Sequence, residues 1–381
     1  MRTFWQRVTE GIKISDLWTQ FQAEARTSYG LYAREVDWEA IEKGKKWQRP
    51  LRIAWALFQA MLMKLSPARR LLLLLAAFLM VYPAPALLLI LLADDQRSGV
   101  LEVKFFMLGS ALLFVLLALE LADRVTMKRD LEIAREIQRW LVPESPPEVS
   151  GYDLAFMSRP ANTVAGDYYD TIPRGGARDA GAKDGKLLLV VADVAGKSVP
   201  AAILMATFQA SLRAIEAAGT ALGELVRSMN SYVCENSRNG LRFITAFFAE
   251  IETGSGDIRY TSAGHYPALV RRASGEVEEL SEGGLPLGIE PDEQFPSGQT
   301  RIGAGDILFI YTDGLVEAVN AREEEFGKTR LANVLRPCDG THTAAEILAQ
   351  ITRVLDGFVG AARQRDDITY MVVRRRQAAT V

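Results

Sequence analysis

The most apolar part of the chain is a pair of long hydrophobic runs in its first third. Residues 71–93 read LLLLLAAFLMVYPAPALLLILLA and carry no charge. A second run over 103–122 is interrupted only by Lys104 and Glu120, near its ends. A helix needs about 20 apolar residues to cross a bilayer, and the first run is apolar on every face. We therefore expect two transmembrane helices, at about 71–93 and 103–122 within a region 67–123. The alternative is a buried helical hairpin of a soluble protein.

The charges around these runs indicate how they would be oriented. The loop over 94–102 holds one Arg and three acidic residues, whereas basic residues lie before the first run and after the second. These flanking residues are Lys64, Arg69, Arg70, Arg124, Lys128 and Arg129. Positive charge stays on the cytoplasmic side of a membrane. The sequence thus predicts a multi-pass protein of the inner (cytoplasmic) membrane with both termini in the cytoplasm.

Residues 1–66 are unusually rich in tryptophan, with five of the six in the chain. The stretch 51–65 is apolar but too short to span a bilayer, which favours a helix lying in the membrane interface. We predict a cytoplasmic or interfacial segment over 1–66. A small soluble bundle that buries these tryptophans is an equally good interpretation.

A polar helical connector is expected at 124–149. No Pro or Gly occurs from 121 to 141, and Pro143 and the prolines after it then end the helix. Five residues of the connector, most of them apolar, are spaced alternately four and three positions apart. They are Met127, Leu131, Ala134, Gln138 and Leu141. Such spacing suits either a short seam between two protomers, giving a homodimer, or a helix packed on its own domain.

From 150 to 376 the pattern is that of a β-rich domain with a few helices. Strands are expected at 152–157, 186–191, 243–251, 258–261, 268–271, 306–311 and 368–373, and helices at about 199–217, 221–236, 328–336 and 343–359. Short Gly turns between successive strands suggest antiparallel pairing. Helices grouped between blocks of strands indicate an α+β fold rather than an alternating α/β fold.

The composition excludes several classes of binding and metal sites. The net charge is −3, and residues 150–381 carry 24 Lys and Arg against 30 Asp and Glu, which gives no sign of nucleic-acid binding. Only two cysteines and two histidines occur, so neither a disulfide framework nor a zinc site built on several histidines is expected. Any metal would need carboxylates.

Aspartates are concentrated in four short clusters of the soluble domain. These are GDYYD at 166–170, ADVAGKS at 192–198, YTDGLVEA at 311–318 and RDDIT at 365–369. A single aspartate at a strand end usually caps a turn. Four clusters in one domain are harder to explain as caps alone, since converging carboxylates repel one another unless a cation neutralises them. Hard oxygen ligands of this kind are typical of Mg²⁺ or Mn²⁺.

Taken together and in order, these clusters and their neighbours resemble one family. The chain from about 131 to 375 resembles the SpoIIE/RsbU branch of the PPM metal-dependent serine/threonine phosphatases. Further matching stretches are LEIAREIQRWLVP (131–143), RPANTVAGDYYD (159–170), SAGHYPALV (262–270) and GGLPLGI (283–289). The resemblance implies a sandwich of two antiparallel sheets flanked by helices, with two Mn²⁺ or Mg²⁺ ions at one end.

Carried over position by position, the resemblance implies a set of metal ligands. Asp193 would bridge the two ions, and the backbone carbonyl of Val194 would help to hold the second. Asp313 and Asp366 would complete the shell of the first ion, and Asp167 would act on the second ion. Asp193, Asp313 and Asp366 are thus the expected catalytic residues.

Other residues of these motifs are expected to play supporting roles. Asp170 and Asp367 are expected just outside the ligand set. His265 suits a structural turn better than catalysis, and Arg159 and Lys197 are weak candidates for phosphate contacts. The general acid is not assigned, because no histidine follows Asp193.

The resulting expectation is a membrane-anchored phosphatase that hydrolyses phosphoserine or phosphothreonine on a partner protein. In this branch the substrates are often anti-anti-sigma proteins of the STAS type. The alternative is a catalytically silent, membrane-tethered module that only binds a partner.

Overall fold

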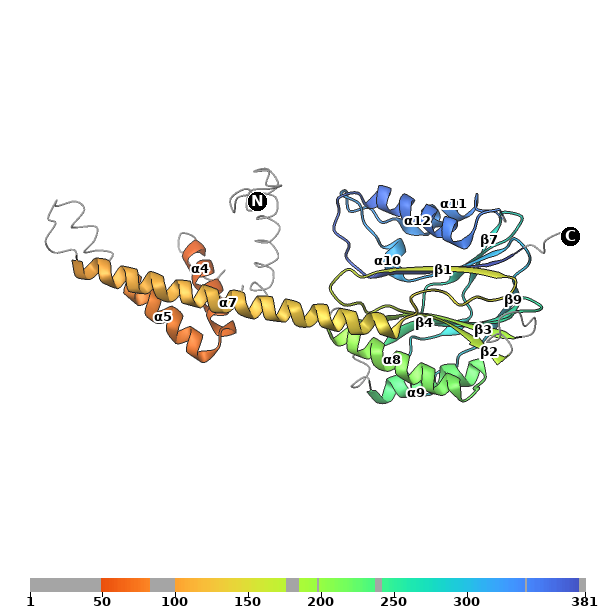
Figure 1. Cartoon of the computed structure of the whole chain (residues 1–381), viewed down its shortest axis with the longest axis horizontal. Coiled ribbons are helices and arrows are strands. Elements are labelled where there is room, and N and C mark those ends of the chain that lie inside the picture. Colours follow the sequence, from red (N-terminus) through yellow and green to blue (C-terminus); the bar gives the residue numbers. More distant parts are fainter. Residues whose placement is uncertain are drawn as a thin grey trace, which may run out of the picture. The chain divides into compact units, whose positions relative to one another are not determined.

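The computed structural model describes residues 49–82, 100–175, 185–196, 199–236, 242–339 and 341–376 (Figure 1). The chain divides into two compact units, Met1–Thr126 and Met127–Val381. Most of the predicted tryptophan-rich segment and of the predicted loop between the two apolar runs lies outside the described residues. The same is true of Lys197.

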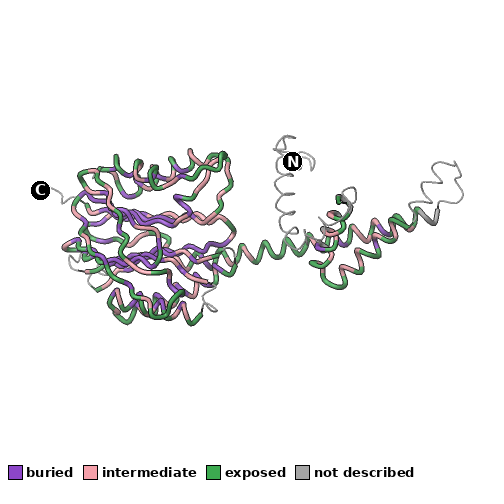
Figure 2. Tube along the Cα trace, turned by 180° about the vertical axis from the view of Figure 1, so that it is seen from behind, coloured by how far each residue is buried: buried purple, intermediate pink, exposed green. Residues whose placement is uncertain are grey.

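The first unit is helical, with α4 (Arg49–Lys64), α5 (Pro67–Val81) and the first part of α7 (Val100–Leu141). Arg69 on α5 pairs with Asp123 at 2.6 Å and with Glu120 at 3.3 Å on α7. A Cβ at Gly109 would lie 3.0 Å from the carbonyl oxygen of Ala76, so the absence of a side chain there allows α5 and α7 to approach closely. Many leucine and phenylalanine residues of both helices are exposed, and Figure 2 colours much of these helices as exposed or intermediate.

One helix among the described residues, running over Val103–Leu141, is long and apolar enough to cross a membrane. The predicted first span at 71–93 coincides with α5 only as far as residue 81, and it continues outside the described residues from 83 onward. The two-span hairpin and its orientation therefore stay predictions.

The second unit is a sandwich of two sheets. One sheet has the order β1-β11-β10-β6-β7 and the other β2-β3-β4-β5-β8, with β9 pairing to β5. The strands of the first sheet are β1 (Tyr152–Arg159), β6 (Ala268–Arg271), β7 (Val277–Leu280), β10 (Ile307–Tyr311) and β11 (Ile368–Arg375). Those of the second are β2 (Tyr168–Arg174), β3 (Lys186–Val194), β4 (Ile244–Glu252), β5 (Asp257–Ala263), β8 (Gly283–Gly284) and β9 (Gly298–Arg301).

Helices cover the outer face of each sheet (Figure 1). α8 (Val199–Ala217) and α9 (Leu222–Asn236) pack on β3 and β4, whereas α10 (Asp313–Val316), α11 (Gly327–Leu335) and α12 (Ala344–Val359) belong to the layer on β1 and β11. Alternation along each strand divides the core into three layers, because successive side chains point to opposite faces. In β3, Leu187, Leu189 and Val191 face the other sheet, and Leu188 and Val190 face the helices.

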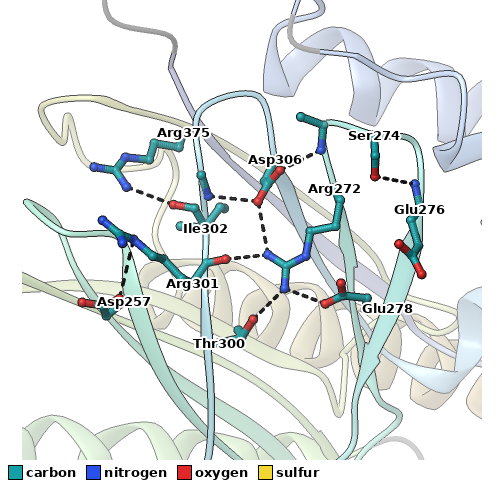
Figure 3. A network of polar contacts seen from close by, with 12 residues as sticks. Asp257, Arg272, Ser274, Glu276, Glu278, Thr300, Arg301, Ile302, Asp306 and Arg375 are labelled. Carbon is teal, nitrogen blue, oxygen red and sulfur yellow. Dashed lines mark hydrogen bonds and ion pairs between the residues drawn. The ribbon is translucent and has the colours of Figure 1, made fainter.

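A polar network ties the two sheets together at one end (Figure 3). Arg272, which follows β6, donates to Asp306 at 3.2 Å, to Glu278 at 2.5 Å, and to the backbone carbonyl of Arg301 at 2.5 Å. Arg375 at the end of β11 donates to the carbonyl oxygen of Ser255 in the other sheet's β4–β5 turn at 2.6 Å. Because β10 begins next to Asp306 and β11 ends at Arg375, the other ends of these two strands are free to build a site.

The predicted α+β sandwich is confirmed, and so are all seven predicted strands and four predicted helices of this unit, with boundaries shifted by up to three residues. Sequence reasoning missed β2, the short strands β7, β8 and β9, and the one-turn helix α10. β2 was missed because it begins within the motif GDYYD, and aspartate is a poor strand residue.

Candidate metal-dependent active site

Four aspartates lie where strands of both sheets end. Antiparallel pairing sets Tyr168 at the start of β2 opposite Ala192 near the end of β3, so Asp167 and Asp193 are neighbours. In the other sheet, Tyr311 at the end of β10 is paired with Tyr370 near the start of β11. Asp313 therefore follows β10 at the same edge at which Asp366 precedes β11. The four aspartates come from distant parts of the sequence, and strand pairing alone explains each of the two pairs.

The two pairs are close enough to influence each other electrostatically. Burial, and then the carboxylates of Asp313, Asp366 and Asp367, raise the pKa of Asp193 to about 7. Burial, and then Asp193 and Asp367, raise the pKa of Asp167 well above its usual range. Buried like charges destabilise one another, and a divalent cation would relieve this repulsion.

Gly166 permits a close approach between the two sides of this cluster. A Cβ at this position would lie 3.2 Å from the carbonyl oxygen of Val194 and 3.6 Å from Oδ1 of Asp193. The missing side chain therefore lets the backbone of Gly166 lie next to both the Val194 carbonyl and the Asp193 carboxylate. This is the pair of oxygens that the sequence predicted as ligands on β3.

Asp167 is held in place by Thr312, a residue that sequence reasoning missed. The fully buried Thr312 hydroxyl donates to Oδ2 of Asp167 at 2.9 Å and accepts from the backbone N–H of Thr369 at 3.0 Å. One hydroxyl thus joins the carboxylate that precedes β2 to β10 and β11 of the other sheet. The available signal was a hydroxyl residue directly before the aspartate in YTDG.

Asp366 and Asp367 have different surroundings. Asp367 accepts from the backbone N–H of Ala161 at 2.7 Å and from that of Gly166 at 2.6 Å, so both its oxygens hold the loop that carries Asp167. That Asp366, and not Asp367, is the ligand stays a prediction.

Asp170 lies on the opposite face of β2 from Asp167. It accepts from Arg213 of α8 at 2.7 Å and from the hydroxyl of Tyr168 at 2.5 Å. Its expected place just outside the ligand set is therefore wrong: Asp170 fixes α8 to the sheet, because its strand position directs it away from the cluster.

His265 is buried between the sheets. Its Nε2 lies 3.0 Å from the carbonyl oxygen of Tyr311, which can only accept, so Nε2 carries the proton and Nδ1 accepts from the Thr245 hydroxyl at 3.0 Å. Burial lowers the pKa of His265 to about 4. With both nitrogens engaged, this neutral ring is a structural link, as the sequence suggested.

Whether a metal ion fits between the candidate ligands depends on their spacing and on their chemistry. Among the described residues, no three Asp, Glu, His or Cys side chains meet at ligating distance around one point. Facing carboxylates repel one another, so this spacing is expected of them. Their chemistry nevertheless fits hard divalent cations: all candidate ligands are oxygens, and Gly166, which has no side chain, lies beside two of them.

The end of α7 packs on the same unit. The Gln138 amide forms two hydrogen bonds with the backbone of Ala165, one from Nε2 to the carbonyl oxygen at 2.7 Å and one from the N–H to Oε1 at 2.9 Å. The connector was expected either to form a seam between two protomers or to pack on its own domain. At Gln138 it packs on its own domain. Gln138 thereby contacts the backbone two residues before Asp167.

The fold and the acidic end of the sandwich define a phosphatase of the metal-dependent PP2C class. The family model described as Stage II sporulation protein E (SpoIIE) matches residues 183–376, and the chain belongs to this family of PPM phosphatases.

Similar proteins include Protein IcfG of Synechocystis sp., which is 29% identical over 286 residues, covering 68% of this chain and 43% of IcfG. Phosphoserine phosphatase RsbU of Bacillus subtilis is 25% identical over 254 residues, covering 66% of this chain and 71% of RsbU. The chain thus spans less than half of IcfG. The solved SiaA-PP2C domain of Pseudomonas aeruginosa has the same fold, with a TM-score of 0.56, 21% identity, and coverage of 66% of this chain and 98% of that domain.

Proposed function

We propose that this chain is a membrane-anchored, metal-dependent phosphatase that removes phosphate from phosphoserine or phosphothreonine on a regulatory partner protein. One observation carries the proposal. Aspartates from both sheets gather at one end of the sandwich, where burial and then the neighbouring carboxylates raise the pKa of Asp193 to about 7. Such a cluster costs stability unless it binds cations, which is the expected signature of a functional site.

The residues have separate roles in this proposal. Asp193 would bridge two ions, with Asp313 and Asp366 on one of them, and with Asp167 and the Val194 carbonyl on the other. When bound, Mn²⁺ or Mg²⁺ supplies Lewis-acid activation of water and neutralises charge on the phosphoryl group. Thr312 orients Asp167, and Asp367 fixes the loop that carries it. His265 takes no part in proton transfer, since both its nitrogens are engaged within the core.

The test is hydrolysis of a phosphoserine peptide by the full chain in detergent, with and without Mn²⁺ or Mg²⁺. We expect Asp193→Asn to reduce the rate at least tenfold, a loss of about 1.4 kcal/mol in transition-state stabilisation or more. Its thermal unfolding without metal should stay at or above that of the wild type, because a buried carboxylate is removed. Retention of more than a tenth of the rate would refute the two-ion assignment.

The partner and the location are the finer part of the proposal. The name of RsbU, a phosphoserine phosphatase, supports a phosphoprotein substrate, and we propose one of the STAS type in the cytoplasm. Release of phosphate from a phosphorylated STAS protein, and not from a phosphorylated protein of another fold, would support this. The exposed apolar residues of α5 and α7 support anchoring in the cytoplasmic membrane.

A homodimer through the connector is also proposed, on a different face from the predicted seam. Ile133, Ile137 and Trp140 of α7 are exposed and are spaced four and three apart, which suits a coiled-coil contact. Sedimentation of the detergent-solubilised chain should show a dimer that Trp140→Glu dissociates. An unchanged sedimentation coefficient in this variant would count against the contact.

A silent binding module is the alternative function. It would need no intact ligand set, and here every candidate ligand is present. Absence of any Mn²⁺-dependent hydrolysis, together with retained binding of a phosphorylated partner, would favour this alternative.

A further inference from the structure

A cleft of about 460 Å³ opens beside the candidate site. Gly314 and Asp366 line it, so it is continuous with the acidic cluster. The rest of its wall comes from the end of β1, the segment 317–325, the C-terminal end of α12 and the loop 362–365. Its volume lies within the range of roughly 300–1,000 Å³ that is typical of specific ligand pockets.

Basic side chains line one part of the cleft. Arg159, at the end of β1, pairs with Asp356 of α12 at 2.7 Å, and Arg365 pairs with Glu323. All four of these side chains are at least one-third exposed, and exposed ion pairs contribute at most about 1 kcal/mol. An acidic group on a bound molecule could therefore replace these partners at little cost.

Two of the arginines have unused hydrogen-bonding capacity. The buried Nε of Arg159 has no hydrogen-bond partner among the described residues. Arg363 is exposed, and no described side chain forms an ion pair with it. An exposed guanidinium without a protein partner can form a charge-assisted pair with an acidic group of a bound molecule.

The loop with these arginines is fixed relative to the site. The Gln364 amide donates to the carbonyl oxygen of Arg159 at 2.7 Å and to that of Asp366 at 2.8 Å. One side chain thus holds the end of β1 against the residue that precedes Asp367 and β11. The backbone that carries Arg363 and Arg365 is thereby held next to the candidate ligand Asp366.

The remaining wall has different chemistry. Glu317 accepts from the hydroxyl of Tyr266 at 3.0 Å, and Glu325 adds a second negative charge on the same segment. Val319, Val359 and Ile368 are apolar. The wall therefore carries both signs of charge, and in it Arg159 and Arg365 already face acidic partners, whereas Arg363 forms no ion pair with a described side chain.

We propose that this cleft binds the segment of the phosphoprotein next to the phosphorylated residue, and that Arg363 together with Arg159 selects an acidic side chain in it. The inference rests on the proposed phosphatase function, because a phosphoester at the acidic cluster must place its neighbouring residues in the adjoining space. Since Glu317 and Glu325 also line the cleft, an acidic residue is favoured only where it lies next to Arg363 and Arg159.

The test compares kcat/KM of the full chain in detergent with Mn²⁺ on four phosphoserine peptides of equal length. Two Asp precede the phosphoserine in the first peptide and follow it in the second, two Lys replace the better Asp pair in the third, and only Ala flanks the phosphoserine in the fourth. We expect one of the two Asp peptides to exceed the Ala peptide about tenfold, mainly through KM, as for one charge-assisted contact. Arg363→Glu should reverse the ranking of the Asp and Lys peptides.

Arg227→Glu is the matched control, because Arg227 is an exposed arginine on α9, outside the cleft. It should leave the peptide ranking as in the wild type. The same ranking in Arg363→Glu, or equal rates of the wild type on all four peptides, would overturn the role of the cleft while the phosphatase function stands. Failure of the wild type to hydrolyse any peptide or p-nitrophenyl phosphate would instead overturn the phosphatase function, and the cleft proposal with it.

Discussion

Replacing Thr312 by valine would remove one hydroxyl and keep the shape of the side chain. That hydroxyl donates to Asp167 at 2.9 Å and accepts from the N–H of Thr369 at 3.0 Å, and both threonines are fully buried. A hydrogen bond to a charged group contributes about 1.5–3 kcal/mol, and an unpaired buried N–H costs about 1–3 kcal/mol. These contributions overlap, so we expect Thr312→Val to lower the free energy of unfolding by about 2–4 kcal/mol.

The consequence for the site should exceed the consequence for stability alone. Without the hydroxyl, Asp167 loses the contact that orients it from the other sheet. We expect the Mn²⁺ concentration for half-maximal activity to rise about tenfold, as for loss of a group that orients a ligand. Thermal unfolding without metal and phosphatase activity against Mn²⁺ concentration measure the two effects separately.

Two variants make this test specific. Thr312→Ser keeps the hydroxyl and should restore the Mn²⁺ requirement of the wild type. Thr261→Val removes an equally buried hydroxyl whose contacts are Pro296 and Ser297 rather than a carboxylate. If Thr261→Val and Thr312→Val raised the Mn²⁺ requirement equally, the role given to Thr312 would be refuted.

Three further outcomes are expected. Burial lowers the pKa of His265 to about 4 in the folded protein, so on acidification the unfolded chain takes up a proton at His265 before the folded chain does. The free energy of unfolding should therefore fall by up to about 3 kcal/mol as pH falls from roughly 6.5 to 4. Urea unfolding of His265→Gln should lack this part of the pH dependence, and parallel curves would contradict it. Asp306→Ala breaks the pair with Arg272 and two backbone contacts at the far end of the sandwich. It should cost about 2–4 kcal/mol without changing the Mn²⁺ requirement, and a raised requirement would show that the two ends are coupled. In intact cells, a cysteine at Ser98 should react with an impermeant thiol reagent, and labelling of a C-terminal cysteine in its place would reject the predicted topology.

Strand and helix positions were largely predictable in the second unit because its strands are short apolar runs between turn residues. β3 is an example: alternate residues fill two different core layers, so the run is apolar throughout. β2 was not predictable in this way, since Asp170 sits within it. That aspartate is tolerated only because Arg213 and Tyr168, from positions that no local pattern reveals, satisfy it.

The residues of the candidate site also fall into a group that local sequence patterns predict and a group that they do not. Asp167, Asp193, Asp313 and Asp366 could be named from motifs, because they stand beside strand ends in the sequence. Thr312 and Gln138 could not, because their roles depend on contacts with Asp167 and Ala165, which strand pairing and helix packing bring near. Ligands are local features of the chain, whereas the groups that orient them are features of the folded domain.

The strand order has a consequence for synthesis of the protein. Among the described strands, β1 is the first to be made, and its one neighbour in the sheet is β11, the last. During synthesis on the ribosome, β1 has no β11 to pair with until more than 200 further residues, those between Arg159 and Ile368, have been added. Asp366 enters at the same late moment, so a nascent chain holds an incomplete acidic cluster until the final strand inserts between β1 and β10. An exposed, waiting strand is open to wrong pairing, and the enzyme should therefore depend on protection by chaperones late in translation, just before it first becomes active.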